Sequence, residues 1–148
     1  MKLTTRGHYS VKALLDLSLQ PAGTVSSVNA IATRQSLPAP YLEKLLIELR
    51  RSQIVRATRG PQGGYALAKP LDQISLGQIL EAVGESATPF IKATESTPEL
   101  AEDWVTSMLW QRLNQKLKEA FYSITLEDLY YDARSWQASQ GEGASFVV

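Results

Sequence analysis

The sequence contains no cysteine and only one histidine, His8. Without cysteine the chain has no disulfides, thiolate metal sites, cysteine-held iron-sulfur clusters or cysteine nucleophiles. A Ser-His-Asp triad or a zinc site would have to be built around His8 alone. The candidate acid-base residues His8, Asp16 and Glu43 have no partner at motif spacing. We therefore predict that the chain is not an enzyme and needs no cofactor.

Long apolar runs are also absent, since no stretch approaches the roughly 18 unbroken apolar residues that span a bilayer. The amino terminus lacks a secretory signal pattern, so we expect no membrane partner and a cytoplasmic location. The chain has 148 residues, of which 44% are apolar and 20% are charged. These values predict one globular domain, or one compact domain with an appended oligomerisation element.

Acidic residues are scarce in the first half of the chain and basic residues are scarce in the second, although the net charge is zero. Residues 1–70 contain ten Lys or Arg and three acidic residues, a balance of +7. Residues 71–148 contain five Lys or Arg and twelve acidic residues, a balance of −7. A basic half joined to an acidic half indicates a polyanion-binding face on the first half only.

Helical periodicity predicts three short helices in the basic half. The first covers about residues 6–19, the second follows a cap at Ser26 or Ser27, and the third runs from Pro40 to about Arg51. The third helix has an apolar stripe at helical spacing, formed by Leu42, Leu45, Leu46 and Leu49. Its other side has long polar side chains, which are Tyr41, Lys44, Glu48 and Arg51 with Glu43 and Arg50 on the flank. Such a face is most often solvated surface. Whether it binds a nucleic acid must therefore be inferred from the neighbouring elements.

Two short alternating segments follow, residues 54–58 and 65–67, separated by Arg-Gly-Pro-Gln-Gly-Gly. This pattern predicts a β-hairpin with a basic tip. The glycines could instead cradle a phosphate, but such a loop requires a following helix with Lys-Ser or Lys-Thr, and Tyr-Ala-Leu-Ala comes next. Three helices followed by a hairpin are typical of a winged helix-turn-helix, whose third helix recognises DNA.

The acidic half begins with a helix that Ser75 is expected to cap and that ends near Val83. A long helix from about residue 103 to 122 has more apolar surface than one small domain needs, which favours a dimer interface over a ligand-binding surface. The expected interface residues are Val105, Leu109, Leu113, Leu117 and Phe121. Thr125-Leu-Glu-Asp128 is a capping box for a short last helix.

The predicted fold class is mainly α with a small β-hairpin wing. We expect a winged helix-turn-helix domain over residues 1–84 and a loop over residues 85–102. The dimerisation helix and the short terminal helix fill residues 103–134, and residues 135–148 form a flexible tail.

Four segments resemble the Rrf2 family of bacterial transcriptional regulators. They are LTTRGHYSVKALLDL from Leu3, YLEKL from Tyr41, RGPQGGY from Arg59 and ITLEDL from Ile124. The resemblance covers about residues 1–132, and the wing segment is its most specific part. It implies a homodimer in which the long carboxy-terminal helices cross and two recognition helices enter successive major grooves of a palindromic operator in double-stranded DNA.

The resemblance also implies DNA contacts. It places Arg59 of the wing in the minor groove, where A·T-rich DNA concentrates negative potential. Tyr41, Glu43 and Lys44 match family positions that touch DNA, and glutamate and lysine suit cytosine and guanine edges respectively. Other basic residues are expected to hold phosphates, namely Lys2, Arg50, Arg51 and Arg56. The expected set is Lys2, Thr4, Pro40, Tyr41, Glu43, Lys44, Arg50, Arg51, Arg56, Arg59 and Gly60.

The sequence departs from the family in two places. Many members have hydroxyl residues at the start of the recognition helix, where this chain has Pro38, Ala39 and Pro40 and so loses a side-chain cap. Cluster-binding members have three cysteines in the segment that corresponds to residues 85–102, and this chain has none. Some members have a further ligand near position 8, but without thiolates we expect His8 to be a surface or phosphate-contacting residue.

Two hypotheses follow. The first is a homodimeric, sequence-specific repressor without an iron-sulfur cluster, controlled by a small ligand or by a regulatory protein. The alternative is a winged-helix protein interaction adaptor that no longer binds DNA. The +7 balance of the first half counts against the adaptor, because a polyanion is the obvious partner for that charge.

Overall fold

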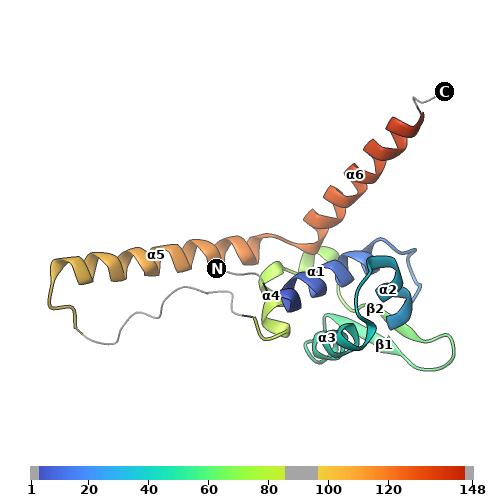
Figure 1. Cartoon of the computed structure of the whole chain (residues 1–148), viewed down its shortest axis with the longest axis horizontal. Helices are drawn as coiled ribbons and strands as arrows, with labels where there is room; N and C mark the ends of the chain where they lie inside the picture. Colours follow the sequence, from blue (N-terminus) through green and yellow to red (C-terminus); the bar gives the residue numbers. More distant parts are fainter. Residues whose placement is uncertain (1–3, 86–96, 146–148) are drawn as a thin grey trace.

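The computed structural model describes residues 4–85 and 97–145, the side chains of residues 142–145 excepted. Lys2 and most of the predicted 85–102 loop therefore lie outside the described residues. The elements are α1 (Thr5–Ser18), α2 (Val28–Gln35), α3 (Ala39–Arg51), β1 (Val55–Thr58), β2 (Gly64–Leu67), the 3₁₀ helix η1 (Leu71–Gln73), α4 (Leu76–Ala82), α5 (Ala101–Ser123) and α6 (Leu126–Ser145). Helices α1–α4 and the hairpin form a compact unit, from which α5 and α6 extend in different directions (Figure 1). The predicted fold class is confirmed.

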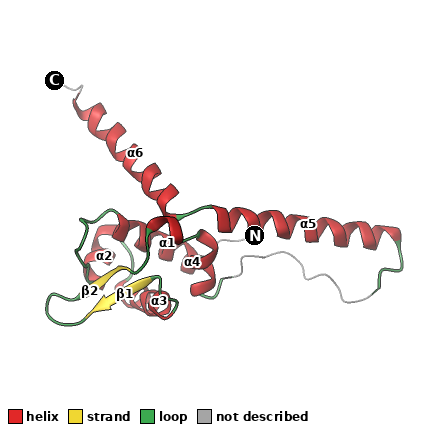
Figure 2. Ribbon diagram, turned by 180° about the vertical axis from the view of Figure 1, so that it is seen from behind, coloured by secondary structure: helices red, strands yellow, loops and turns green. Residues whose placement is uncertain are grey.

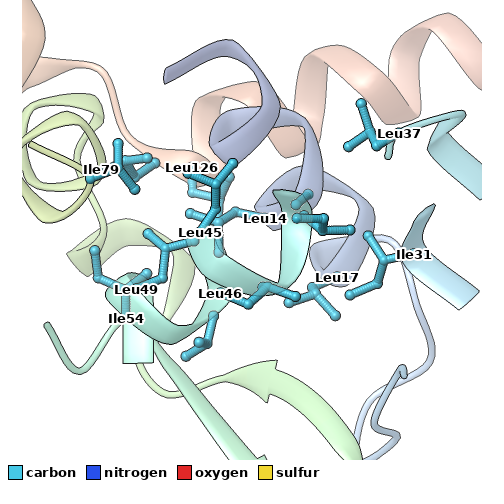
Figure 3. Close-up of a cluster of buried hydrophobic side chains, with 14 of the residues drawn as sticks. Leu14, Leu17, Ile31, Leu37, Leu45, Leu46, Leu49, Ile54, Ile79 and Leu126 are labelled. Carbon is cyan, nitrogen blue, oxygen red and sulfur yellow. The ribbon is translucent and has the colours of Figure 1, made fainter. Parts of the chain in front are cut away.

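The core lies between the first four helices, with α3 on one side of it (Figure 3). All four leucines of the predicted α3 stripe are buried there, beside Leu14 and Leu17 of α1 and Ile31 of α2. Burial of each such side chain contributes about 1.5–3 kcal/mol to folding. Because the stripe takes one side of α3, the polar side of the helix faces solvent.

Capping chemistry sets the turn between α2 and α3. The Ser27 hydroxyl oxygen accepts a hydrogen bond from the Ala30 N–H at 3.1 Å, which confirms one of the two predicted caps. Helix α2 ends at Ser36 in a left-handed conformation with φ 56°, and the Leu37 N–H then donates to the Ala32 carbonyl at 2.9 Å. Helix α3 starts without a side-chain cap after Pro38, as predicted.

The wing is an antiparallel hairpin in which Val55 pairs with Leu67 and Thr58 pairs with Gly64. Strand β1 lies beside α3, and β2 pairs with β1 and contacts α1 (Figure 2). At the tip, the Gly63 N–H donates to the Gly60 carbonyl at 2.9 Å and closes the turn. A Cβ on Gly63 would lie 2.1 Å from the Thr58 carbonyl oxygen, so the turn leaves no room for a side chain at that position.

Two capping boxes start α4 and α6 side by side. Ser75 and Gln78 exchange hydrogen bonds of 2.8 and 3.2 Å, and Thr125 and Asp128 exchange bonds of 2.9 and 3.2 Å. Backbone bonds of 2.8 Å from Leu76 to Ile124 and from Leu126 to Ile74 join the two helix starts. Both predicted caps are confirmed.

Helix α6 is much longer than predicted. It continues for 20 residues to Ser145, so the expected short helix and the expected tail from residue 135 are wrong. Gly141 and Gly143 suggested an end because each glycine costs about 1 kcal/mol in a helix. The cost is offset by the capped start and by good helix formers such as Ala133 and Gln137.

Among the residues that the structure describes, no helix is both long and apolar enough to cross a membrane.

Candidate nucleic-acid interface

The solvent side of α3 is a row of exposed charged side chains. It consists of Glu43, Lys44, Arg50 and Arg51, and Pro40 is exposed at its start. These residues face outward because the leucine stripe occupies the core side of the same helix. The structure therefore brings together the α3 residues that the sequence assigned to DNA, with one exception.

The exception is Tyr41, which was predicted to lie on the outward side. Its ring is partly buried against the core and meets the ring of Tyr9 edge-on, with centroids 5.9 Å apart and planes at 76°. Tyr41 therefore links the start of α3 to α1, and only part of its surface is left for DNA. Glu48 is also partly buried rather than fully outward.

The wing adds a second group of exposed residues next to α3. Arg56 projects from β1, and Arg59 and Gly60 lie at the hairpin tip, all three exposed. Gly60 has φ 109°, a backbone conformation that favours glycine. Thr4 is exposed just before α1 and makes no side-chain cap bond.

The cations of the basic half fall into two sets. Three of them hold the fold together, because Arg6 donates to the Val83 carbonyl at 2.9 Å, Lys12 donates to the Gln35 carbonyl at 2.9 Å, and Arg34 pairs with Asp16 at 2.7 Å. The second set makes no ion pair or side-chain hydrogen bond with any residue that the structure describes. The exposed members of this second set are named the free-cation set here: they are Lys44, Arg50, Arg51, Arg56 and Arg59, on α3 and the wing, whereas Lys69, which follows β2, is partly buried.

Sequence reasoning missed the pairing of Asp16 with Arg34. Asp16 is 2% exposed and lies on the buried side of α1, between Ala13 and Leu17. Its hydrogen bonds and charge raise the pKa of the Arg34 guanidinium above its usual value. An acidic residue within an apolar stripe was the available signal, because a buried carboxylate requires a partner.

The predicted dimer interface divides into two parts. Val105, Leu109 and Leu113 are exposed on α5, and Trp104 beside them is 56% exposed. Leu117 and Phe121 instead pack with Leu80 of α4 in the same chain, and Phe121 is only 8% exposed. The first three residues are therefore open to a partner, whereas α4 covers Phe121 and part of Leu117; the dimer interface itself stays a prediction.

The residues present do not fit the iron-sulfur cluster of the Rrf2 family. That cluster is held by thiolates, and the chain has no cysteine. Within the described parts of the chain, no three His, Cys, Asp or Glu side chains gather as a metal site. His8 is exposed on α1, where it lies next to Tyr9.

Three helices around one core, an outward third helix and a basic hairpin beside it define a winged helix-turn-helix protein. The family model for Rrf2, an iron-dependent transcriptional regulator, matches residues 3–132. The chain belongs to the Rrf2 family. Its relatives are transcriptional regulators and not enzymes, and the chain is likewise not an enzyme.

The chain is similar to regulators along its whole length. A Synechocystis sp. protein named as an HTH-type transcriptional regulator is 64% identical over 148 residues, which is 100% of both chains. The structure of CymR, the global cysteine regulator of B. subtilis, has a TM-score of 0.76 at 30% identity and covers 88% of this chain and 97% of its own. The structure of T. potens IscR has a TM-score of 0.74 at 36% identity, covering 93% and 91%.

Proposed function

We propose that the chain is a homodimeric, sequence-specific DNA-binding repressor that works in the cytoplasm by occupying promoters and excluding polymerase. The observation that carries this proposal is the free-cation set on α3 and the wing. Winged-helix proteins place these two elements against DNA, and exposed cations without acidic partners bind phosphates most strongly.

The proposed binding mode follows from where each side chain lies. Glu43 and Lys44 are near the start of α3, the end that meets base edges when a recognition helix enters the major groove. Arg50 and Arg51 at its far end, with Arg56 on β1, hold phosphates. The wing then brings Arg59 to the adjacent minor groove. Thr4, Pro40, Gly60 and the outer edge of Tyr41 complete the proposed contacts.

We propose that a second copy of the chain packs against the exposed first half of α5. That helix has 23 residues, which is about 34 Å at 1.5 Å per residue and matches one turn of DNA. Two α5 helices that pack through Val105, Leu109 and Leu113 would join two DNA-binding units in one dimer, as a palindromic site requires. Because the cluster ligands are missing, we propose control by a small ligand or by a regulatory protein that meets the segment 85–102.

Salt-dependent binding to promoter fragments tests the proposal. The purified chain should give a specific complex whose logarithmic affinity falls linearly with logarithmic salt concentration. A simultaneous Lys44→Ala, Arg50→Ala and Arg51→Ala variant should lose it, whereas Arg134→Ala on α6 should not. A map of bound sites across the genome would then identify the operator. Weak binding that is the same for every sequence would contradict the proposal and favour the adaptor.

A further inference from the structure

We propose that Asp16 is a positioning residue for DNA binding, because its buried carboxylate fixes the wing relative to the recognition helix through Arg34, Gln35 and Ser26. The inference rests on the proposed function and adds to it residues that touch no DNA. It starts from one observation, that a single carboxylate in the core of the DNA-binding unit is bonded to both residues at the end of α2.

The carboxylate of Asp16 is fully used. Its Oδ2 accepts from Arg34 Nη2 at 2.7 Å and from Arg34 Nε at 3.2 Å, and its Oδ1 accepts from Arg34 Nε at 3.0 Å and from Gln35 Nε2 at 2.8 Å. A guanidinium that meets a carboxylate through two nitrogens is fixed in direction as well as in distance. The contact therefore sets the orientation of the last turn of α2.

This fixed turn leads directly into the recognition helix. Gln35 is the last residue of α2, and it is held twice to α1, through its side chain on Asp16 and through its carbonyl, which accepts from Lys12 Nζ at 2.9 Å. Ser36 turns the chain immediately afterwards, and α3 begins at Ala39. The direction in which α3 leaves the turn is thus determined at Gln35.

The same carboxylate reaches the wing through two further links. Arg34 Nη2 also donates to the Ser26 hydroxyl oxygen at 2.8 Å. Ser26 in turn pairs with Tyr65 of β2 through two backbone hydrogen bonds of 2.9 and 2.7 Å. The approach is so close that a Cβ on Gly64 would lie 2.5 Å from the Ser26 carbonyl group. The base of the wing is therefore seated on Ser26.

A contribution to stability alone does not explain the buried ion pair of Asp16 with Arg34. A buried ion pair is often no more stabilising than apolar side chains of the same volume, whereas its geometry can specify one arrangement. Here the arrangement joins the two elements that hold the free-cation set. A chain without these links would keep its leucine core and the backbone pairing of Ser26 with Tyr65, but the side-chain connection from that pairing to the end of α2 would be lost.

A double-mutant cycle on operator affinity tests the positioning role. In the wild type, Arg59→Ala should weaken binding about 5- to 150-fold. Ser26→Ala removes only the bond between Arg34 and Ser26, and in that background the loss caused by Arg59→Ala should shrink by at least about threefold. The loss caused by Lys44→Ala should be unchanged there, because α3 keeps its own anchor at Gln35.

Asp16→Asn is the stronger variant, and it should reduce the losses from both Arg59→Ala and Lys44→Ala. If Asp16→Asn does not fold, Ser26→Ala and Arg34→Lys still decide, since lysine lacks the planar fork of two nitrogens that holds the Asp16 carboxylate in one direction. Equal losses from Arg59→Ala in every background that folds would overturn the positioning role and leave the proposed function intact. A wild type that binds no specific DNA would overturn both.

Discussion

Tyr122 of α5 donates a hydrogen bond to the carboxylate of Glu81 on α4. That bond, with burial and the negative charge of Glu81 as further causes, raises the pKa of Tyr122 to about 12. Gly77 lies under the same ring, since a Cβ there would be 2.7 Å from the ring carbons. The contact between α5 and α4 of the compact unit thus depends on the Tyr122 phenol, the Glu81 carboxylate and the absence of a side chain at Gly77.

The first prediction concerns the pH dependence of this junction. A tyrosine whose pKa is raised in the folded chain stabilises the fold fully below its unfolded value of about 10, and this contribution is lost as the pH rises through about 12. The ultraviolet titration of the wild type minus that of Tyr122→Phe should have its midpoint near pH 12. Glu81→Ala should move this midpoint toward 10; an unmoved midpoint would show that Glu81 is not the cause.

The second prediction concerns the space under the Tyr122 ring. Gly77→Ala should destabilise the chain by about 1–3 kcal/mol in urea unfolding, because the added methyl group must displace the ring. Gly141→Ala is the matched control on α6, where a Cβ meets nothing within 4 Å. The control should stabilise its helix by up to about 1 kcal/mol. Equal effects of the two substitutions would show that α4 and α5 do not approach each other closely at Gly77.

The third prediction concerns the turn of the helix-turn-helix. Ser36 is held at φ 56°, where a side chain is strained and glycine is not. Ser36→Gly should therefore raise the free energy of unfolding by about 0.5–1 kcal/mol, once the larger unfolded-state entropy of glycine is counted. Gly84→Ala makes the reverse change at φ 76° and should lower it. Thermal unfolding of both variants shows whether each one is stabilised or destabilised. A loss of stability in Ser36→Gly would contradict the left-handed conformation of Ser36.

The fourth prediction separates the two parts of α5. Leu113→Asp changes a residue that is 38% exposed and makes no contact in the core clusters, so it should give folded monomers in sedimentation. Operator affinity should fall steeply, because the two half-sites are then bound independently. Leu117→Asp should instead destabilise the subunit itself, since Leu117 packs with Leu80 and Phe121. A Leu113→Asp dimer would rule out this interface.

The fifth prediction concerns the wing. Arg59→Ala should weaken operator binding by about 1–3 kcal/mol, reduce sequence preference and lower the salt slope by about 1. Arg134→Ala removes another exposed cation, on α6, and should change none of these. Fluorescence anisotropy at several salt concentrations measures all three quantities. Unchanged affinity in Arg59→Ala would show that the wing does not enter the groove.

Local chemistry could be predicted from the sequence almost to the residue. The stripe from Leu42 to Leu49, the caps at Ser75 and Thr125 and the turn at Gly60 are set by neighbours within a few positions, so their pattern is visible in the chain. The exposed positions of Arg56 and Arg59 follow from the same local pattern.

Long-range pairing could not be predicted in this way. Arg34 is one cation among ten until the fold places it against Asp16, and Tyr41 was assigned outward because its packing on Tyr9 depends on how α1 crosses α3. The spacing of the apolar residues on α5 is visible in the sequence, but only the structure shows that α4 covers Phe121. The length of helix α6 does not follow from its two glycines alone, because its capped first turn stabilises the turns after it.

The placement of α5 and α6 outside the compact unit has a spectroscopic consequence. All three tryptophans of the chain lie on these two helices, and Trp136 on α6 is 65% exposed. The DNA-binding unit has none. Intrinsic indole fluorescence therefore observes only what covers α5 and α6, so it can follow the proposed association of two subunits without a label and without a contribution from α3 or the wing.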